Sequence, residues 1–195
     1  MKARVILDEL VAFASEKGTP FWKAIGTSGL GYLCFLNGKS ADAAEKIDAG
    51  VAAYRSLGGR NYLPLYLSCA GQAYAELGQF DDACRRIEEA ITAVEATEER
   101  WWEAEVHRIA GEIALKSQQP DAAKAEAYFE RALAVARAQQ AKSWELRAAM
   151  SMARFWRDQG KPHQARELLA PVYGWFTEGF DTLDLKEAKA LLVGA

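Results

Sequence analysis

An aromatic residue recurs along the chain at a nearly constant interval, and a small residue follows it nine positions later each time. The aromatic positions are Trp22, Tyr62, Trp102 and Trp144, and the small positions are Gly31, Gly71, Gly111 and Ala153. The first two intervals are equal, at about 40 residues, and the third is two positions longer. Repeats of this length bury their apolar faces against neighbouring repeats, because one repeat alone cannot close a core. The chain is therefore predicted to be a repeat array, an architecture typical of binding scaffolds.

Each repeat is predicted to contain two helices, because apolar residues fall at helical spacing and sustained strand-like alternation is absent. The expected first helices cover 20–37, 60–77, 100–117 and 142–159, and the second helices cover 40–57, 80–97, 121–140 and 162–176. The resulting pairs span 20–57, 60–97, 100–140 and 142–176. The turns between paired helices are marked by Gly38, Gly78, Gln118 and Gly160. The two extra residues of the long interval are expected in the third turn, around 119–121.

Three of the recurring small residues are glycines inside expected helices. A glycine there costs about 1 kcal/mol relative to alanine unless another interaction offsets it. The shared register indicates such an offset, namely close approach of the paired helix. A larger side chain at Gly71 is expected to overpack this contact by about 1–3 kcal/mol. The leading aromatic residues are expected to wedge between the end of one repeat and the start of the next.

The two ends of the array differ from its interior. Residues 1–17 keep the repeat register and are predicted to be the second helix of a partial repeat, so the chain is expected to begin inside a repeat. Residues 182–193 leave the register and are predicted to form an amphipathic capping helix, with Phe180 filling the gap before it. Together these features predict one all-α domain over residues 1–195, a right-handed α-solenoid of antiparallel helix pairs with a carboxyl-terminal capping helix.

The second repeat carries a recognisable pattern of small and aromatic residues. The run Leu67-x2-Ala70-Gly71-x2-Tyr74, followed by Ala83-x3-Ile87, resembles the tetratricopeptide repeat. The closing proline of that family is absent from all four repeats, and the period here is about 40 residues rather than 34. Both departures fit lengthened second helices, and pairs of the HEAT type remain the alternative.

A longer resemblance covers the carboxyl-terminal part of the chain. Residues 141–149 (AKSWELRAA) and 168–192 (LLAPVYGWFTEGFDTLDLKEAKALL) are similar to the end of large bacterial signalling proteins. Members of that family carry a class III adenylate/guanylate cyclase domain, then an AAA-like NTPase module, then a tetratricopeptide tail. The resemblance implies a regulatory tail in bacterial signalling. The alternative is that this chain is part of a longer parent protein of that family. Its function would then be the parent's activity, the cyclisation of ATP or GTP.

Composition and charge restrict the class of partner. The net charge is −3 and the isoelectric point is about 5.6, which argues against general affinity for nucleic acid. No apolar run reaches the length of a membrane span, and the amino terminus lacks the apolar centre of a signal peptide. The protein is therefore expected in the cytoplasm, with neither nucleic acid nor a membrane as partner.

Residues with catalytic or metal-binding chemistry do not fall into a recognisable pattern. Phosphate-binding glycine loops and CxxC pairs are absent, so neither a cofactor nor a metal is expected. Cys34 occupies a position held by aromatic residues in other repeats and is predicted to be a buried, reduced thiol; Cys69 and Cys84 stand apart. His107 is predicted to pack and His163 to be solvated. Most of the carboxylates are interpreted as solvated helix faces, including Glu88, Glu89, Glu98 and Glu99. The chain is predicted not to be an enzyme by itself.

The tetratricopeptide resemblance implies a concave groove lined by the first helices. The predicted partner-binding residues are Tyr32, Phe35, Gln72, Glu112, Arg147, Arg154 and Arg157, and the same face includes Ser28, Ser68, Ala75, Glu105, Arg108 and Leu115. This groove runs from aromatic to basic and suits a protein or peptide with an apolar anchor and an acidic end, since Arg binds carboxylates through two hydrogen bonds. The partner is alternatively a sister domain of the parent chain. Two further alternatives stay open: the charged residues pair with one another, or the array self-associates as a structural module.

Overall fold

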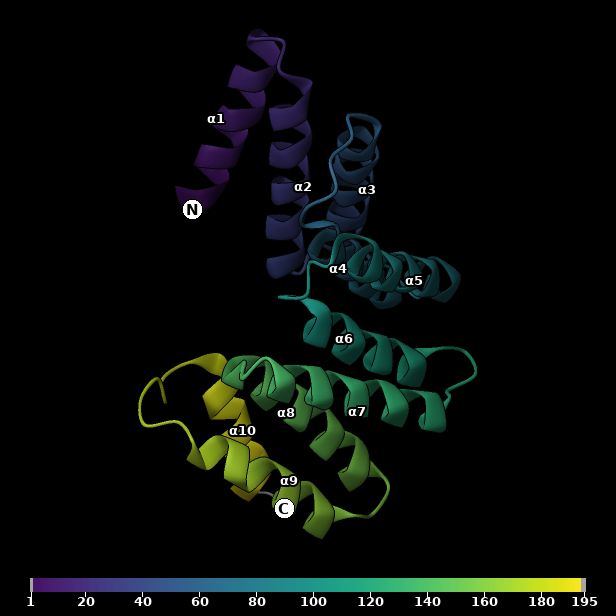
Figure 1. The fold of residues 1–195 in the computed structure, drawn as a ribbon, viewed down its shortest axis with the longest axis vertical. Helices are drawn as coiled ribbons and strands as arrows, with labels where there is room; N and C mark the ends of the chain where they lie inside the picture. The colour runs from purple at the N-terminus through teal and green to yellow at the C-terminus, as the bar shows by residue number, and fades with distance from the viewer. Residues whose placement is uncertain (1, 194–195) are drawn as a thin grey trace. The chain divides into compact units, whose positions relative to one another are not determined.

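The computed structural model describes residues 2–193, and within that range it contains ten α-helices and no strands (Figure 1). The helices are α1 (Lys2–Glu16), α2 (Pro20–Leu36), α3 (Ser40–Ser56), α4 (Leu63–Glu76), α5 (Phe80–Thr97), α6 (Glu103–Lys116), α7 (Ala122–Ala138), α8 (Lys142–Asp158), α9 (Pro162–Gly174) and α10 (Leu183–Val193). The prediction of an all-α fold is confirmed. The largest differences from the expected starting points are at α4 and α6, which begin three residues later than expected.

The chain divides into two compact units, which we call unit 1 (up to Trp102) and unit 2 (from Glu103 onward). In unit 1, α2 packs against α3 and α4 packs against α5; in unit 2, α6 packs against α7 and α8 against α9 (Figure 1). These are the four helix pairs that the repeat register indicates. Additional packing joins α1 to α2 and α3 to α4 in unit 1, and places α10 against α8 and α9 in unit 2.

The turns within the pairs follow the glycine positions. Gly38, Gly78 and Gly160 have φ angles of +68°, +74° and +75°, a region that glycine enters without a Cβ clash. These three turns occupy 37–39, 77–79 and 159–161, whereas the turn between α6 and α7 occupies 117–121. The two extra residues of the long interval therefore lie in this third turn. Asp121 ends the turn by accepting a hydrogen bond of 2.9 Å from the backbone N of Lys124.

The recurring glycines lie where paired helices approach each other closely. A Cβ added at Gly31 would lie 2.7 Å from Ile47 Cγ1 and 2.8 Å from the backbone N of Ile47. A Cβ at Gly71 would lie 3.2 Å from the carbonyl oxygen of Ala83, and one at Gly111 would lie 2.7 Å from Phe129 Cδ1. In each case the second helix of the same pair occupies the space that a side chain would need. This is the close approach that the shared register indicates.

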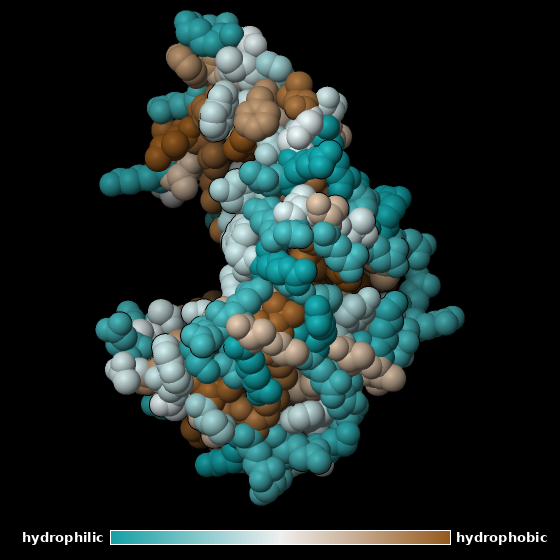
Figure 2. Space-filling model, viewed as in Figure 1, coloured by the Kyte–Doolittle hydropathy of each residue, from teal (hydrophilic) through white to brown (hydrophobic). Residues whose placement is uncertain are grey.

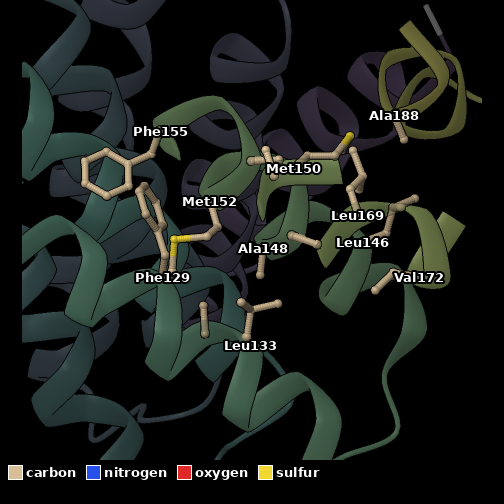
Figure 3. Close-up of a cluster of buried hydrophobic side chains, with 14 of the residues drawn as sticks. Phe129, Leu133, Leu146, Ala148, Met150, Met152, Phe155, Leu169, Val172 and Ala188 are labelled. Carbon is tan, nitrogen blue, oxygen red and sulfur yellow. The ribbon is translucent and has the colours of Figure 1, made fainter. Parts of the chain in front are cut away.

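Unit 2 has a continuous apolar core between α7, α8, α9 and α10 (Figure 3). Met152 and Phe155 of α8 lie beside Phe129 of α7, and the Phe129 and Phe155 ring centroids are 6.1 Å apart. Leu169 of α9 and Ala188 of α10 complete the other end of this core. Helix α10 packs its apolar face onto this core, which agrees with its predicted amphipathic character.

The leading aromatic residues do not share one environment, which corrects the expectation that all four wedge between repeats. Trp102 is buried and Trp144 is half-buried against Ala104 and the α7 helix, but Trp22 and Tyr62 are 54% and 51% exposed. Trp22 and Trp144 lie inside the first turn of a helix, whereas Tyr62 and Trp102 precede one. The position in the register therefore fixes where the residue lies along the chain but not what covers its ring.

Among the other side chains, Cys34 and His163 have the predicted environments, whereas Phe180 does not. Phe180 was expected to fill the gap before the capping helix, but it is 47% exposed and contacts the Tyr173 ring at a centroid distance of 5.8 Å. Cys34 is buried and is a free thiol, as predicted. His163 is exposed to solvent, as predicted, with Glu167 at 3.4 Å.

The first helix of unit 1 exposes apolar side chains. Leu7, Leu10 and Val11 of α1 face Gly26 and Gly29 of α2, and this contact accounts for one side of the helix. Val5, Ile6 and Phe13 remain largely exposed. Figure 2 shows apolar surface gathered over α1 and α2. None of the helices in residues 2–193 combines the length and the apolar character needed to cross a bilayer.

Candidate partner-binding surfaces

Two of the predicted groove residues of unit 2, Glu112 and Arg147, belong to a network of ion pairs that starts on α6. Arg108 donates from Nε and Nη2 to the two carboxylate oxygens of Glu105, both at 2.8 Å. Arg108 also pairs with Glu112 one turn further along the helix. The side chains of Glu105 and Arg108 are only 3% and 7% exposed, so this pair is removed from water. Burial disfavours the charged guanidinium, but the two carboxylates outweigh burial and raise the pKa of Arg108.

The network continues across to α8. Arg147 reaches Glu105 at 2.8 Å, so that carboxylate binds one arginine from each helix. Ser151 donates a hydrogen bond of 3.0 Å to Glu112 and lies 3.3 Å from Arg108 Nη1. The Arg147 guanidinium also lies over the Trp144 ring, 5.6 Å from its centroid. Of the predicted partner-binding residues, Glu112 and Arg147 therefore join α6 to α8 within unit 2.

The remaining arginines of α8 contact the last helix. Arg154 forms an ion pair of 2.6 Å with Glu187 of α10, and the two side chains are 43% and 44% exposed. Arg157 donates a hydrogen bond of 3.4 Å to the backbone oxygen of Leu191. The alternative in which the charged residues pair with one another thus describes Glu105, Arg108, Glu112 and Arg147, but not Arg154. The partner of Arg154 is a residue of the capping helix, which the sequence did not indicate.

The predicted groove residues of unit 1 are apolar or uncharged and half-buried. Phe35 packs against a small cluster formed by Cys34, Ala43, Ala44, Ala73 and Tyr74. Tyr32 and Gln72 are also of intermediate exposure, on α2 and α4. These two helices contact each other within unit 1, so the structure places the three residues on neighbouring first helices.

A second ion-pair network, which sequence reasoning missed, links α3, α4 and α5 in unit 1. Arg86 donates to Asp48 at 2.7 Å and to Glu89 at 2.8 Å, and Arg55 donates to Glu89 at 2.6 Å. The Tyr74 hydroxyl donates to Asp48 at 2.6 Å. Burial acts to raise the pKa of Glu89, but the two arginines outweigh it and lower the pKa. Asp48 and Arg86 are separated in sequence by nearly one repeat period. This separation is the sequence feature that could have indicated the pair.

The loop that follows α5 also holds residues that the sequence interpretation placed wrongly. Helix α5 ends at Thr97, so Glu98 and Glu99 lie in a loop and not on a helix face. Glu99 accepts hydrogen bonds from the backbone N of Tyr62 at 2.7 Å and from Trp101 Nε1 at 2.8 Å. Trp101, which directly precedes the recurring Trp102, was the sequence signal for this cluster.

His107 of α6 is a partly buried titratable group of unit 2. Its ring stacks on Tyr128 of α7 at a centroid distance of 6.1 Å, and its Nδ1 is buried without a hydrogen-bond partner in the described part of the chain. Burial lowers the pKa of His107, Glu103 opposes this effect and Arg131 adds to it. The predicted packing role fits this environment, because a neutral ring is favoured there.

This environment gives an expected pH dependence. The folded-state pKa of His107 lies below the value of about 6.5 for the unfolded chain, so the unfolded state binds a proton first as the pH falls. The contribution of neutral His107 to stability is therefore intact above about pH 6.5 and is lost as the pH falls from there through the lower folded-state pKa.

Urea denaturation of the wild type and of His107→Gln at pH 7.5 and pH 5.5 measures this effect. The fall in the unfolding midpoint between the two pH values should be smaller in the variant. His163→Gln is the matched control, because it makes the same substitution at a histidine that is exposed to solvent. An equal fall in the wild type and in His107→Gln would contradict the assignment to His107.

Metal-binding side chains do not cluster in the described part of the chain. Within residues 2–193, His, Cys, Asp and Glu side chains do not gather in groups of three or more that would hold a metal ion.

The chain matches no family model, and no curated protein matches it significantly.

Proposed function

We propose that this chain is a non-catalytic scaffold for protein interaction, built as a right-handed solenoid of the tetratricopeptide type. Four consecutive helix pairs support the proposal, and three of them have a close helix approach at the same register position. Stacked helix pairs of this kind present extended binding faces. The HEAT-like alternative predicts the same class of function.

The observation that carries the proposal is the exposed ion pair between Arg154 of α8 and Glu187 of α10. Exposed pairs contribute only about 0–1 kcal/mol, so a carboxylate from another protein competes with Glu187 at little cost. Arg157 lies one turn from Arg154 on the same helix and contacts the end of α10. The acidic partner segment that the sequence predicts therefore binds the arginines that α10 now occupies.

Glu105, Arg108 and Arg147 have a different role in this proposal. Their charges are paired with one another within unit 2, and the Glu105–Arg108 pair is buried. They hold α6 and α8 in a fixed relation and so orient the helix that carries Arg154 and Arg157. Partner capture should accordingly depend on Arg154 and Arg157 and not on direct contact with the buried pair.

Affinity capture from a bacterial cytoplasmic extract tests the proposal, with retained proteins identified by mass spectrometry. The Arg154→Glu/Arg157→Glu variant should retain about tenfold less of a specific partner, because two charge-assisted contacts become repulsive. Glu187→Gln should retain up to about fivefold more, because the internal competitor loses its charge.

The matched control for this experiment is Arg4→Glu/Arg85→Glu, which reverses two exposed arginines that pair with acidic neighbours on their own helices. This control should retain the partner like the wild type. If the α8 variant and the control bind equally, the α8 face is not the binding surface. Circular dichroism of each variant should show unchanged helix content.

The resemblance of residues 141–192 to the tails of cyclase-type signalling proteins supports a more specific proposal. The scaffold would then hold a partner or a sister domain and bias the activity of modules encoded in the same gene. This proposal rests on the sequence resemblance alone. Sequencing the complete gene tests it, because a cyclase-type parent must encode the catalytic aspartates upstream of this array.

A further inference from the structure

The backbone of Tyr62 adopts a conformation that an aromatic residue rarely takes. Its φ and ψ angles are 61° and 2°, in the left-handed region where the Cβ is crowded by the backbone. Burial of the ring does not offset this strain, because the side chain is 51% exposed. Trp22 and Trp144, the corresponding residues of two other repeats, lie within helices α2 and α8. Strain that persists at an exposed side chain is typical of binding sites.

One carboxylate holds Tyr62 and Trp101 together. Glu99 accepts from the Tyr62 backbone N at 2.7 Å and from Trp101 Nε1 at 2.8 Å. The next residue, Trp102, anchors the loop, since it is buried and its Nε1 donates to Ser68 Oγ at 3.0 Å. The loop therefore fixes the position of Trp101 relative to Tyr62 in unit 1.

The two rings that Glu99 positions are accessible. The Tyr62 and Trp101 ring centroids are 6.1 Å apart and their planes meet at 72°, an edge-to-face contact in which the two rings form the walls of a corner. Trp101 is 42% exposed, and the Trp102 ring supports it from within at a centroid distance of 5.2 Å. The faces of aromatic rings attract cations, and a neighbouring carboxylate adds to that attraction.

We propose that Tyr62, Trp101 and Glu99 form a binding site for a cationic side chain, Lys or Arg, of a partner peptide. The aromatic faces supply the cation–π contact and Glu99 supplies the opposite charge. This site goes beyond the proposed function above, because it lies in unit 1, uses none of the α8 arginines and selects the opposite charge. A purely apolar ligand would contact the rings but would gain nothing from the Glu99 charge.

The test uses the full chain labelled with 15N and follows the tryptophan indole N–H signals by NMR. The probes are acetyl-Gly-Ser-X-Ser-Gly-amide peptides in which X is Lys, Arg or norleucine, a neutral residue with the aliphatic stem of Lys. The Lys or Arg peptide should shift the Trp101 signal in a saturable manner, and the norleucine peptide should not. The shift should weaken at high NaCl concentration, because exposed charges are then screened.

The Tyr62→Gly variant separates loss of binding from loss of folding. Glycine suits the left-handed backbone, so the variant removes one wall of the site without adding strain. The dissociation constant for the Lys peptide should rise by about two- to fivefold, the range expected for one exposed cation–π contact. Trp22→Leu removes a similarly exposed ring elsewhere in unit 1 and should leave the constant unchanged.

Two results would overturn the proposal. Equal shifts with the norleucine and Lys peptides would show an apolar surface, and unchanged binding by Tyr62→Gly would show that the ring pair is not the site. The Arg154→Glu/Arg157→Glu variant should bind the Lys peptide like the wild type. Failure of this site and failure of the α8 binding surface are therefore distinguishable.

Discussion

The Glu105→Ala variant is expected to lose about 3–5 kcal/mol of unfolding free energy, the largest effect that we anticipate for a single substitution in unit 2. Glu105 is the shared partner of Arg108 and Arg147, and both members of the Glu105–Arg108 pair are buried. Removing the carboxylate leaves the Arg108 charge in a site from which water is excluded. Glu112 remains beside Arg108 but is more exposed and supplies only part of the lost interaction.

Urea denaturation followed by far-ultraviolet circular dichroism measures this loss. The double variant Glu105→Leu/Arg108→Met should recover most of it, because replacing both charges with apolar groups removes the cost of burying either one alone. Arg154→Met is the surface control and should change stability by no more than about 1 kcal/mol. If Glu105→Ala is as stable as the Arg154→Met control, the buried network does not hold α6 and α8 together.

The second large effect is expected for Gly31→Ala in unit 1. A Cβ at this position would lie 2.8 Å from the backbone N of Ile47, and backbone atoms move only if α2 and α3 separate. Overpacking costs about 1–3 kcal/mol of unfolding free energy, and a contact with backbone atoms places this site near the upper end of that range. The higher helix propensity of alanine offsets about 1 kcal/mol of this cost. The net loss should therefore be about 2 kcal/mol.

Two further glycines make this prediction specific. Gly174→Ala is the matched control, because a Cβ there meets no atom within 4 Å and alanine should be neutral or stabilising. Gly71→Ala should fall between the two, since its closest contacts are at 3.2 Å. Unfolding midpoints of the three variants give the order directly. Equal stability of Gly31→Ala and Gly174→Ala would mean that close helix approach does not explain the recurring glycine.

The helix pairs could be predicted from sequence because their signals are local or strictly periodic. Glycines with positive φ ended the first helices, and small residues at a fixed register marked where two helices approach. The late start of α4 was not predicted, because Tyr62 is left-handed and donates its backbone N–H to Glu99, 37 residues away. Secondary-structure propensities describe local sequence only and cannot indicate such a long-range contact.

The candidate site was predicted only as a set of residues. The sequence placed Arg147, Arg154 and Arg157 on one helix face, but it did not indicate the α10 partners of Arg154 and Arg157. Those partners depend on side-chain direction and on where α10 docks, as the Arg154–Glu187 pair shows. Trp22 and Trp102 illustrate the same limit, since equivalent register positions gave one exposed and one buried ring. Periodicity specifies backbone positions, whereas tertiary contacts determine burial and charge pairing.

The three cysteines all lie in unit 1 and differ sharply in accessibility. Cys84 is exposed on α5, whereas Cys34 and Cys69 are buried in α2 and α4. A thiol reagent therefore modifies Cys84 first, and it reaches Cys69, which is 2% exposed, only when α4 opens. The modification rate of Cys69 consequently reports the opening of unit 1 alone, so its local stability is measurable in the intact chain without any added label.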